Sequence, residues 1–373
     1  MYTLYDLQQY WWLLVSIIGG FFVFMMFVQG GQTLLNTLAK TQDEKDLIIN
    51  SLGRKWEIGF SSLIMFGGAL FAAFPLFYSV SFGGAYYVWM SILFCFIIQA
   101  VSYEYRKKPN NVYGEVFYER LLFINGSLGI FLIGVALGTL YTGGNFEVND
   151  MNLSHWTNSS YGLEALLNPF NLLFGLILVL LSRIQAMLYF FNSLDNDNIK
   201  QRIISRLKIE FLLFLPIFLI WMLMLFTNDG YSYDEKSLIV FVEPYKMLHN
   251  LIEVPTLFAN IIIGVIIFLF SIFNTIVLKK ENSIWFLGFS TVLLVTSILM
   301  LLGVNNTIIY PSLSDLQSSL SIKNSSGSLY TLEVMSIVSL LVPVVIGYIV
   351  IVWRSMDKEQ LSIDEVKSDP HHY

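Results

Sequence analysis

The chain has 373 residues, of which 55% are hydrophobic and only 13% charged, and its mean hydropathy is +0.65. Soluble domains carry about 25% charged residues, so this composition excludes an ordinary soluble fold and indicates a protein with several membrane spans. The net charge of −6, without a basic stripe carrying interleaved aromatic residues, argues against a nucleic-acid partner. The single cysteine, Cys95, excludes an intrachain disulfide, and the start of the chain lacks the features of a cleaved signal peptide.

The longest uncharged segment, residues 58–103, contains 46 residues without Asp, Glu, Lys or Arg. At ~1.5 Å per helical residue it would extend roughly 69 Å, which is about two crossings of a ~30 Å hydrocarbon core. Pro75 and the small residues of 79–84 mark a turn near its middle. The segment therefore predicts a hairpin of two spans with both ends on one side, which makes Glu57 and Arg106 candidate neighbours.

Seven further windows with few charged residues predict the remaining spans, because a charge at the bilayer centre costs at least ~2.5 kcal/mol. They are residues 7–39, 121–146, 165–191, 211–228, 254–278, a part of 282–314, and 334–353. Four glycines in the second of these windows have the spacing of a close helix contact: Gly126, Gly129, Gly134 and Gly138. We expect an all-α bundle of nine spans, arranged as two four-helix bundles and one peripheral helix, with the sixth span the shortest.

The distribution of basic residues predicts the orientation of these spans. Of the 21 Lys and Arg residues, 18 fall on or near one side and three on the other: Lys236, Lys246 and Lys323. Short cytoplasmic loops hold the excess of Lys and Arg, so the N-terminus is predicted outside and the C-terminus in the cytoplasm. Residues 1–354 form one membrane domain in this interpretation, and residues 355–373 form a polar cytoplasmic tail that we expect to be disordered.

Residues that could perform chemistry within the spans are few. All four histidines lie outside the predicted spans, and no nucleotide-binding, nucleophile or metal-binding motif is present, so we expect no metal site and no catalysis by this chain alone. Glu57 could conduct protons, or could be a helix-start acid or an ion-pair partner of Arg106. Arg183 could extend its side chain to the interface, and Gln29, Gln32 and Gln185 could form hydrogen bonds between helices.

Several motifs resemble subunit II of the cytochrome bd ubiquinol oxidase family. The resemblance is carried by Asn50-Ser51-Leu52, Trp56-Glu57, the run from Gly67 to Pro75, Tyr103-Glu104-Tyr105-Arg106, and Asn168-Pro169-Phe170 followed by Gln185 and Tyr189. It implies a multi-pass protein of the bacterial inner membrane that pairs with a haem-bearing subunit I. Such a complex oxidises quinol, reduces O₂ to water and takes protons from the cytoplasm.

The same resemblance places haem b and haem d in the partner subunit, so that this chain ligates no cofactor. It allows a bound quinone and small single-span accessory subunits. By analogy, Trp56 and Glu57 would lie near the proton route, and Arg106 and Gln185 are further candidates for proton-path or structural polar residues. Gln29 and Gln32 stand where the family usually has an acidic run, and Ser62 stands where an aromatic residue is common.

Two other functions remain open at this point. A secondary transporter or channel with a polar intramembrane path would require helix breaks at equivalent places of two halves. Pro216 and Pro343 are the clear candidates for such breaks, and they are not equivalently placed. A lipid-binding assembly factor without turnover is the second alternative.

Overall fold

The computed structural model describes residues 3–368 and residue 373. Within these residues, nine helical stretches are long and apolar enough to cross a membrane, as the sequence predicts. Their helices are α1 (Leu4–Met25) with α2 (Phe27–Gln32); α4 (Gln42–Gly53) with α5 (Trp56–Ala73); α7 (Tyr86–Tyr105); α8 (Glu115–Ile124), a π-helical turn (Asn125–Gly129) and α9 (Ile130–Thr142); α10 (Pro169–Ser193); α11 (Asp197–Thr227); α13 (Pro255–Ile276); α14 (Ser283–Met300); and α16 (Leu329–Val338) with α17 (Val342–Met356).

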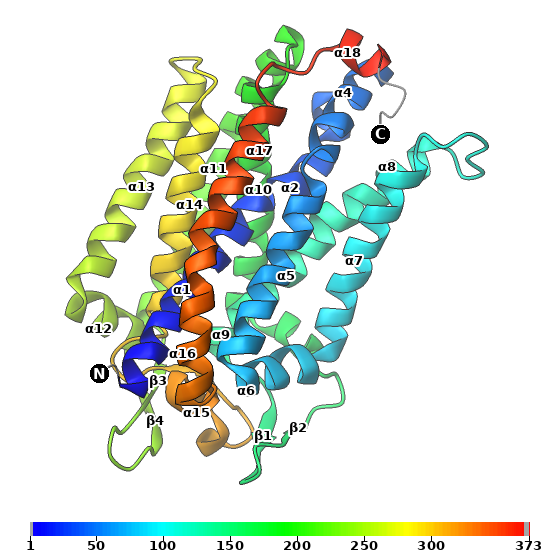
Figure 1. Ribbon diagram of the computed structural model, residues 1–373. Coiled ribbons are helices and arrows are strands. Elements are labelled where there is room, and N and C mark those ends of the chain that lie inside the picture. Colours follow the sequence, from blue (N-terminus) through cyan, green and yellow to red (C-terminus); the bar gives the residue numbers. More distant parts are fainter. Residues whose placement is uncertain (1–2, 369–372) are drawn as a thin grey trace.

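The spans lie side by side in one bundle, in which α1 begins at one end and α17 ends at the other (Figure 1). Helices α5, α7, α8 and α9 lie on one side, and α11, α13 and α14 lie on the other. Helices α1 and α10 join the two groups, because α1 packs against α5 and α14 and α10 packs against α9 and α11. The last span lies on the outside against α1 and α5, and most of its surface is exposed. This arrangement agrees with two groups of four spans and a peripheral ninth helix.

The predicted hairpin is present in the structure. Helix α5 ends at Ala73, and the chain then turns through the short helix α6 (Pro75–Tyr78) and a π-helix (Ser79–Gly84) before α7 begins. Proline at the first position of α6 fits there, because the amide hydrogen that it lacks would have no partner in the first helical turn. The turn thus occupies the residues that the sequence indicated.

The sixth span is longer than predicted. Helix α11 covers 31 residues, and its first turns contain Lys200, Arg202, Arg206 and Lys208. A window chosen for the absence of charge excludes these residues. The helix nevertheless continues through them, because they lie at the end of the bundle, where Lys200, Arg202 and Arg206 bind Glu281, Glu44 and Glu210 and Lys208 is exposed. The prediction of a short sixth span is therefore wrong.

The predicted glycine contacts are confirmed for the fourth span. A Cβ atom on Gly126 would lie 2.1 Å from the carbonyl oxygen of Gln29, and one on Gly134 would lie 2.6 Å from Cα of Gly175. On Gly138 it would lie 2.5 Å from the Asn171 side chain. Real Cβ atoms do not come so close, so the π-helical turn can approach α2, and α9 can approach α10, only because these positions lack side chains.

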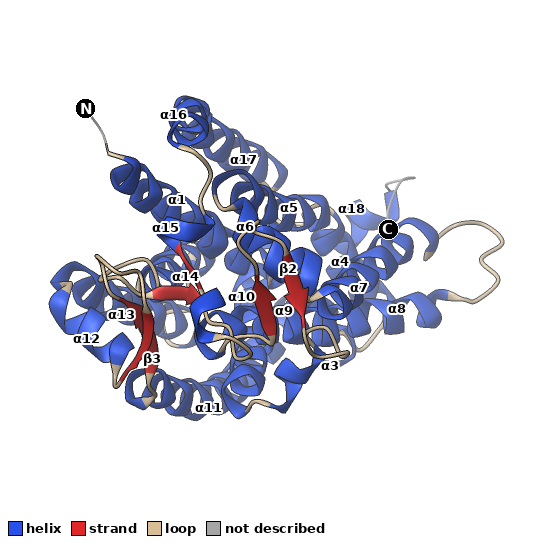
Figure 2. Ribbon diagram, turned by 90° about the horizontal axis from the view of Figure 1, so that it is seen from below, coloured by secondary structure: helices blue, strands red, loops and turns tan. Residues whose placement is uncertain are grey.

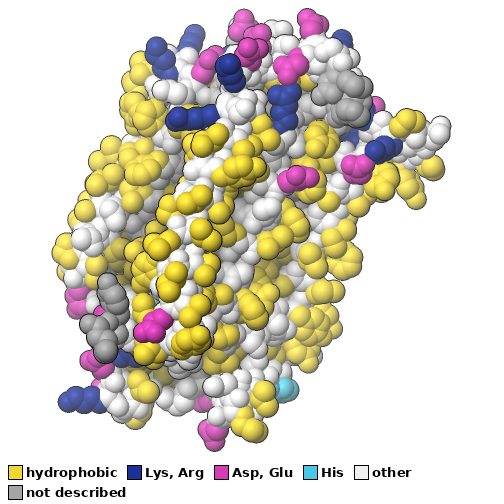
Figure 3. All heavy atoms as spheres, viewed as in Figure 1, with side chains coloured by type: hydrophobic (Ala, Val, Ile, Leu, Met, Phe, Trp, Pro, Cys, Tyr) yellow, Lys and Arg dark blue, Asp and Glu magenta, His cyan; other side chains and the backbone are white. Residues whose placement is uncertain are grey.

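Lys and Arg side chains gather at the end that carries α4 and α18 (Ile363–Ser368), which we call the basic end (Figure 3). The opposite end holds α12 (Lys246–Glu253), α15 (Ile322–Ser325) and three two-stranded antiparallel sheets (Figure 2). The strands are β1 (Phe146–Val148) with β2 (Ser154–Trp156), β3 (Gly230–Tyr233) with β4 (Val240–Glu243), and β5 (Ile308–Tyr310) with β6 (Leu320–Ser321). The prediction of an all-α chain did not include these sheets.

The tail expected to be disordered is ordered in its described part. Asp357 forms an ion pair with the buried Lys55, with 2.9 Å between Oδ1 and Nζ. Leu361 pairs with Leu194, and α18 lies against α4, where Glu365 binds Arg54. The prediction failed because these polar residues find partners on the basic end rather than in water. Residues 369–372 lie outside the described part of the chain.

Candidate functional site

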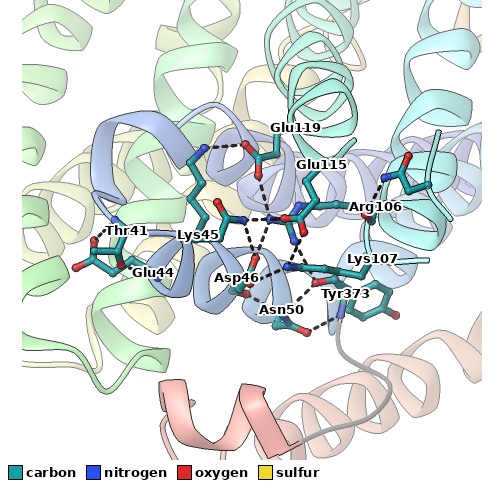
Figure 4. A network of polar contacts seen from close by, with 12 residues as sticks. Thr41, Glu44, Lys45, Asp46, Asn50, Arg106, Lys107, Glu115, Glu119 and Tyr373 are labelled. Carbon is teal, nitrogen blue, oxygen red and sulfur yellow. Dashed lines mark hydrogen bonds and ion pairs between the residues drawn. The ribbon is translucent and has the colours of Figure 1, made fainter. Parts of the chain in front are cut away.

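Arg106 is the centre of a network of charges at the basic end (Figure 4). Its side chain is fully buried, and Nη2 lies 2.7 Å from Asp46, 2.9 Å from Glu119 and 3.0 Å from Glu115. Lys107 also bridges Asp46 and Glu115, and Lys45 binds Glu119 at 2.8 Å. Three cations and three carboxylates therefore join α4, α7 and α8. Because every charge has a partner, the network suits a clamp between helices.

A ladder of amide side chains continues from this network into the bundle. On α7, Gln99, Tyr103 and Arg106 are spaced so that they share one face of the helix. Gln29 donates a hydrogen bond to Gln99 over 3.0 Å, and Gln32 donates one to the Tyr103 hydroxyl over 3.3 Å. The side chains of Gln29, Gln32, Gln99 and Tyr103, which we call the ladder, are all buried. Helices α2 and α7 therefore enclose a polar strip inside an apolar bundle.

Tyr103 connects the ladder to the residues at its mouth. Its ring stacks on Trp56, with 5.9 Å between ring centroids, and meets the ring of Tyr373 edge to face at 5.6 Å. The backbone of Tyr373 is held by Asn50, which accepts from its N–H at 2.8 Å, and its oxygen lies 3.3 Å from Nη1 of Arg106. Aromatic rings and the Arg106 network thus cover the basic end of the ladder.

Several buried polar atoms along this strip have no hydrogen-bonding partner among the described residues. They are Gln32 Oε1, Gln99 Nε2, Trp56 Nε1 and both polar side-chain atoms of Asn125. Asn125 lies in the π-helical turn that packs against α2 and α7. Leaving a buried donor or acceptor without a partner costs about 1–3 kcal/mol of stability. Several such atoms close together therefore mark a place where ordered water can bind.

The structure separates the predicted site residues into different places. Trp56 and Arg106 both lie around Tyr103, at the mouth of the ladder. Glu57 lies in the first turn of α5 and is exposed, and it forms no ion pair within the described chain. The alternative ion pair with Arg106 is therefore not formed, whereas the alternative of a helix-start acid agrees with the position of Glu57. The roles of these residues stay predictions.

The other two polar residues singled out in the fifth span lie away from the ladder. Gln185 is buried on α10 and donates to the Thr291 hydroxyl of α14 over 3.1 Å, as a hydrogen bond between helices requires. Arg183 binds Glu210 at 2.6 Å and donates to Thr33, so it is paired inside the bundle rather than extended to the interface. Gln185 thus shares no contact with Trp56, Glu57 or Arg106 in these interactions.

Sequence reasoning missed Asn125 and the three carboxylates of the Arg106 network. The spacing of Gln99, Tyr103 and Arg106 could have predicted a polar face on α7. Glu115 and Glu119, one helical turn apart just before a predicted span, could have predicted an acidic partner for it. No group of His, Cys, Asp and Glu side chains suited to a metal ion occurs among residues 3–368 and 373. His371 and His372 lie outside that part.

Fold and site together define a multi-pass integral membrane protein whose spans enclose a polar strip at one end. Residues 7–356 match the model of the family described as cytochrome bd terminal oxidase subunit II, and the chain belongs to this family. The match covers all nine predicted spans. It supports the interpretation drawn from the motifs and not the alternative of a transporter or channel.

Known relatives agree with this assignment. The chain is 28% identical over 354 residues to cytochrome bd-I ubiquinol oxidase subunit 2 of Escherichia coli K12, and this match covers 91% of each chain. It is 29% identical over 182 residues to cytochrome bd ubiquinol oxidase subunit 2 of Bacillus subtilis, 48% of this chain and 51% of that one. In fold it resembles a chain of the bd oxidase from Geobacillus thermodenitrificans, with a TM-score of 0.66 at 14% identity, covering 94% of this chain and 98% of that one.

Proposed function

We propose that this chain is the subunit of a quinol-oxidising, O₂-reducing terminal oxidase that ligates no haem itself. The observation that carries the proposal is the family match over residues 7–356. The chain acts as a scaffold for a haem-bearing subunit I in the bacterial inner membrane, with its basic end in the cytoplasm. The partner supplies haem b and haem d and the redox chemistry, and quinol and O₂ are the substrates of the complex.

Co-purification tests this proposal directly. We expect the chain, extracted in mild detergent with an affinity tag, to carry an equimolar partner with b-type and d-type haem absorption. Small single-span subunits would appear in the same preparation. The isolated chain should hold no haem. Stoichiometric haem on the chain alone, or movement of a solute without any partner, would contradict the proposal.

An exposed face of α5 is suited to the partner subunit. Glu57, Ser61, Ile64, Gly68 and Phe71 follow one another at helical spacing, and all five are exposed. A Cβ on Gly68 would have no heavy atom within 4 Å, so the glycine is not explained by contacts inside the chain. A carboxylate, a hydroxyl and a glycine favour contact with another protein helix over contact with lipid tails.

We assign proton uptake to the basic end of the molecule. The ladder of Gln29, Gln32, Gln99 and Tyr103 does not titrate at neutral pH, but its unpartnered atoms suit ordered water, which carries protons along hydrogen bonds. Glu57 supplies the carboxylate of this route, and it lies on the face assigned to the partner. Trp56, the neighbour of Glu57 in the sequence, stacks on Tyr103 of the ladder, so the carboxylate lies beside the mouth of the ladder.

A Glu57→Gln substitution is expected to slow oxygen consumption by the complex several-fold while leaving the haem spectrum unchanged. The amide keeps the size and hydrogen bonding of the side chain but cannot release a proton. Quinol-dependent oxygen uptake, measured per haem, gives the result.

The matched control for this experiment is Glu104→Gln. Glu104 is an exposed acid at the basic end of α7, and it pairs with Lys108. It should lose no activity. Full activity in the Glu57→Gln complex would remove Glu57 from the mechanism, and an equal loss in both complexes would indicate a general effect of charge.

One cavity of the described bundle could hold the apolar tail of a bound quinone. A cavity of about 300 Å³ between α1, α10, α11, α13 and α14 is lined almost entirely by apolar side chains, among them Phe22, Phe66, Phe174 and Trp221. It fits an isoprenoid or acyl chain. The polar quinone ring would find few partners there, so we assign the cavity to a structural tail rather than to quinol oxidation.

A further inference from the structure

A second polar feature of the basic end lies beside α4, the helix whose Lys45 and Asp46 belong to the Arg106 network. An open cavity of about 730 Å³ lies between the turn that follows α3 (Leu35–Leu38) and the start of α11. Its lining is polar and contains three cationic side chains. The lining residues are Thr37, Lys40, Glu44, Asn198, Gln201, Arg202, Ser205, Arg206 and Ile209.

The charge of this cavity is positive after its internal pairs are counted. Arg202 binds Glu44, and Glu210 is shared between Arg206 and Arg183, at 2.8 Å and 2.6 Å. Lys40 is exposed, and its ammonium group has no ion-pair partner among the described residues. The four cations in and next to the cavity are Lys40, Arg183, Arg202 and Arg206, and the two carboxylates are Glu44 and Glu210. Together they carry a net charge of +2.

Both arginines of the cavity have N–H donors that are not used by contacts within the described chain. Arg202 uses Nε for the carbonyl of Asn198 and Nη2 for Glu44. Arg206 uses Nε and Nη2 for Glu210. Nη1 of each arginine has no protein partner within the described chain. These protein contacts hold both guanidinium groups in place, as suits binding of a phosphate.

An apolar track begins where the cavity ends. Along α11, Ser205 and Ile209 line the cavity, and the same helical face continues with Leu212, Leu219 and Leu223. These three leucines are 72%, 57% and 64% exposed. A cationic, hydroxyl-lined hollow at the end of a span, followed by an exposed apolar stripe, matches the phosphate headgroup and acyl chain of one amphiphile.

We propose that this cavity binds the headgroup of an anionic phospholipid, with its phosphate near Lys40, Arg202 and Arg206 and one acyl chain along α11. Basic hollows between spans favour anionic headgroups, and each nearby Lys or Arg contributes about 1 kcal/mol. Inorganic phosphate shares the headgroup chemistry but lacks the chain. The lipid joins the α3–α4 segment to α11, two elements that touch each other only at this end.

The test uses the purified complex in detergent and counts bound lipid by native mass spectrometry. Phosphatidylglycerol is titrated against a phosphatidylcholine background. We expect Lys40→Gln to raise the dissociation constant of one phosphatidylglycerol about five-fold, the equivalent of about 1 kcal/mol for one basic residue. Ser205→Phe, which places a bulky ring in the cavity without changing charge, should also weaken that binding event.

Lys280→Gln is the matched control, because Lys280 is an exposed lysine of the basic end in the loop after α13. It should leave binding unchanged, and unaltered haem spectra and elution profiles show that all variants are folded. Unchanged binding in both Lys40→Gln and Ser205→Phe would overturn the proposal. Equal binding of phosphatidylcholine, an equal loss in Lys280→Gln, or full displacement by inorganic phosphate would also overturn it.

Discussion

Replacing Gly134 with alanine is expected to destabilise the complex by about 1–2 kcal/mol. The new Cβ would lie 2.6 Å from Cα of Gly175 and 2.9 Å from the carbonyl oxygen of Phe174. Because both are backbone atoms of α10, the contact can be relieved only if α9 and α10 move apart. Overpacking of this kind costs about 1–3 kcal/mol, which outweighs the ~1 kcal/mol by which alanine favours a helix over glycine.

The matched control for this substitution is Gly347→Ala. Gly347 lies within α17, where an added Cβ would meet no heavy atom within 4 Å. Only the helix preference then remains, so stability should be unchanged or raised by up to about 1 kcal/mol. Thermal unfolding of the purified complex, followed through haem absorption, gives both values. If Gly134→Ala matched the wild type, α9 and α10 would not pack as closely as described.

The order and number of the spans could be predicted because charge is excluded from the bilayer core wherever it lacks a partner. The hairpin of residues 58–103 follows from that rule, and its turn follows from Pro75 and the small residues of 79–84. The same rule fails at the bundle ends, where charges do have partners. It made the predicted sixth span too short, because α11 begins 14 residues before the predicted window. The separate prediction of a disordered polar tail failed for a similar reason, because residues of the tail bind Lys55 and Arg54.

The candidate site was less predictable, because it depends on which faces of different helices meet. Glu57 and Arg106 do lie at the same end, as the hairpin requires, but Arg106 points to α4 and α8 while Glu57 is exposed. A helix turns by a full circle in 3.6 residues, so a shared end does not imply a shared face. The glutamines of the ladder were visible as polar residues, but their partners on α7 follow only from the packing.

Arg106→Met is expected to weaken the basic end strongly, by about 3 kcal/mol. The substitution leaves Asp46 and Glu119 partly or fully buried with one lysine each, and removes the guanidinium that contacts three carboxylates at once. Removing one partner of a buried ion pair costs about 3–5 kcal/mol, and the lower value applies because Glu115 and Asp46 are partly exposed. Thermal unfolding of the complex and the protease sensitivity of α8 would measure the loss.

The double variant Arg106→Met with Glu119→Gln separates a structural role of Arg106 from one in proton uptake. It removes a cation and an anion together, so less uncompensated charge is buried and part of the stability should return. If oxygen consumption returns with the stability, Arg106 acts as a clamp between α4, α7 and α8. If the complex is stable but slow, Arg106 also serves the proton route. An Arg106→Met complex as stable as the wild type would contradict the clamp altogether.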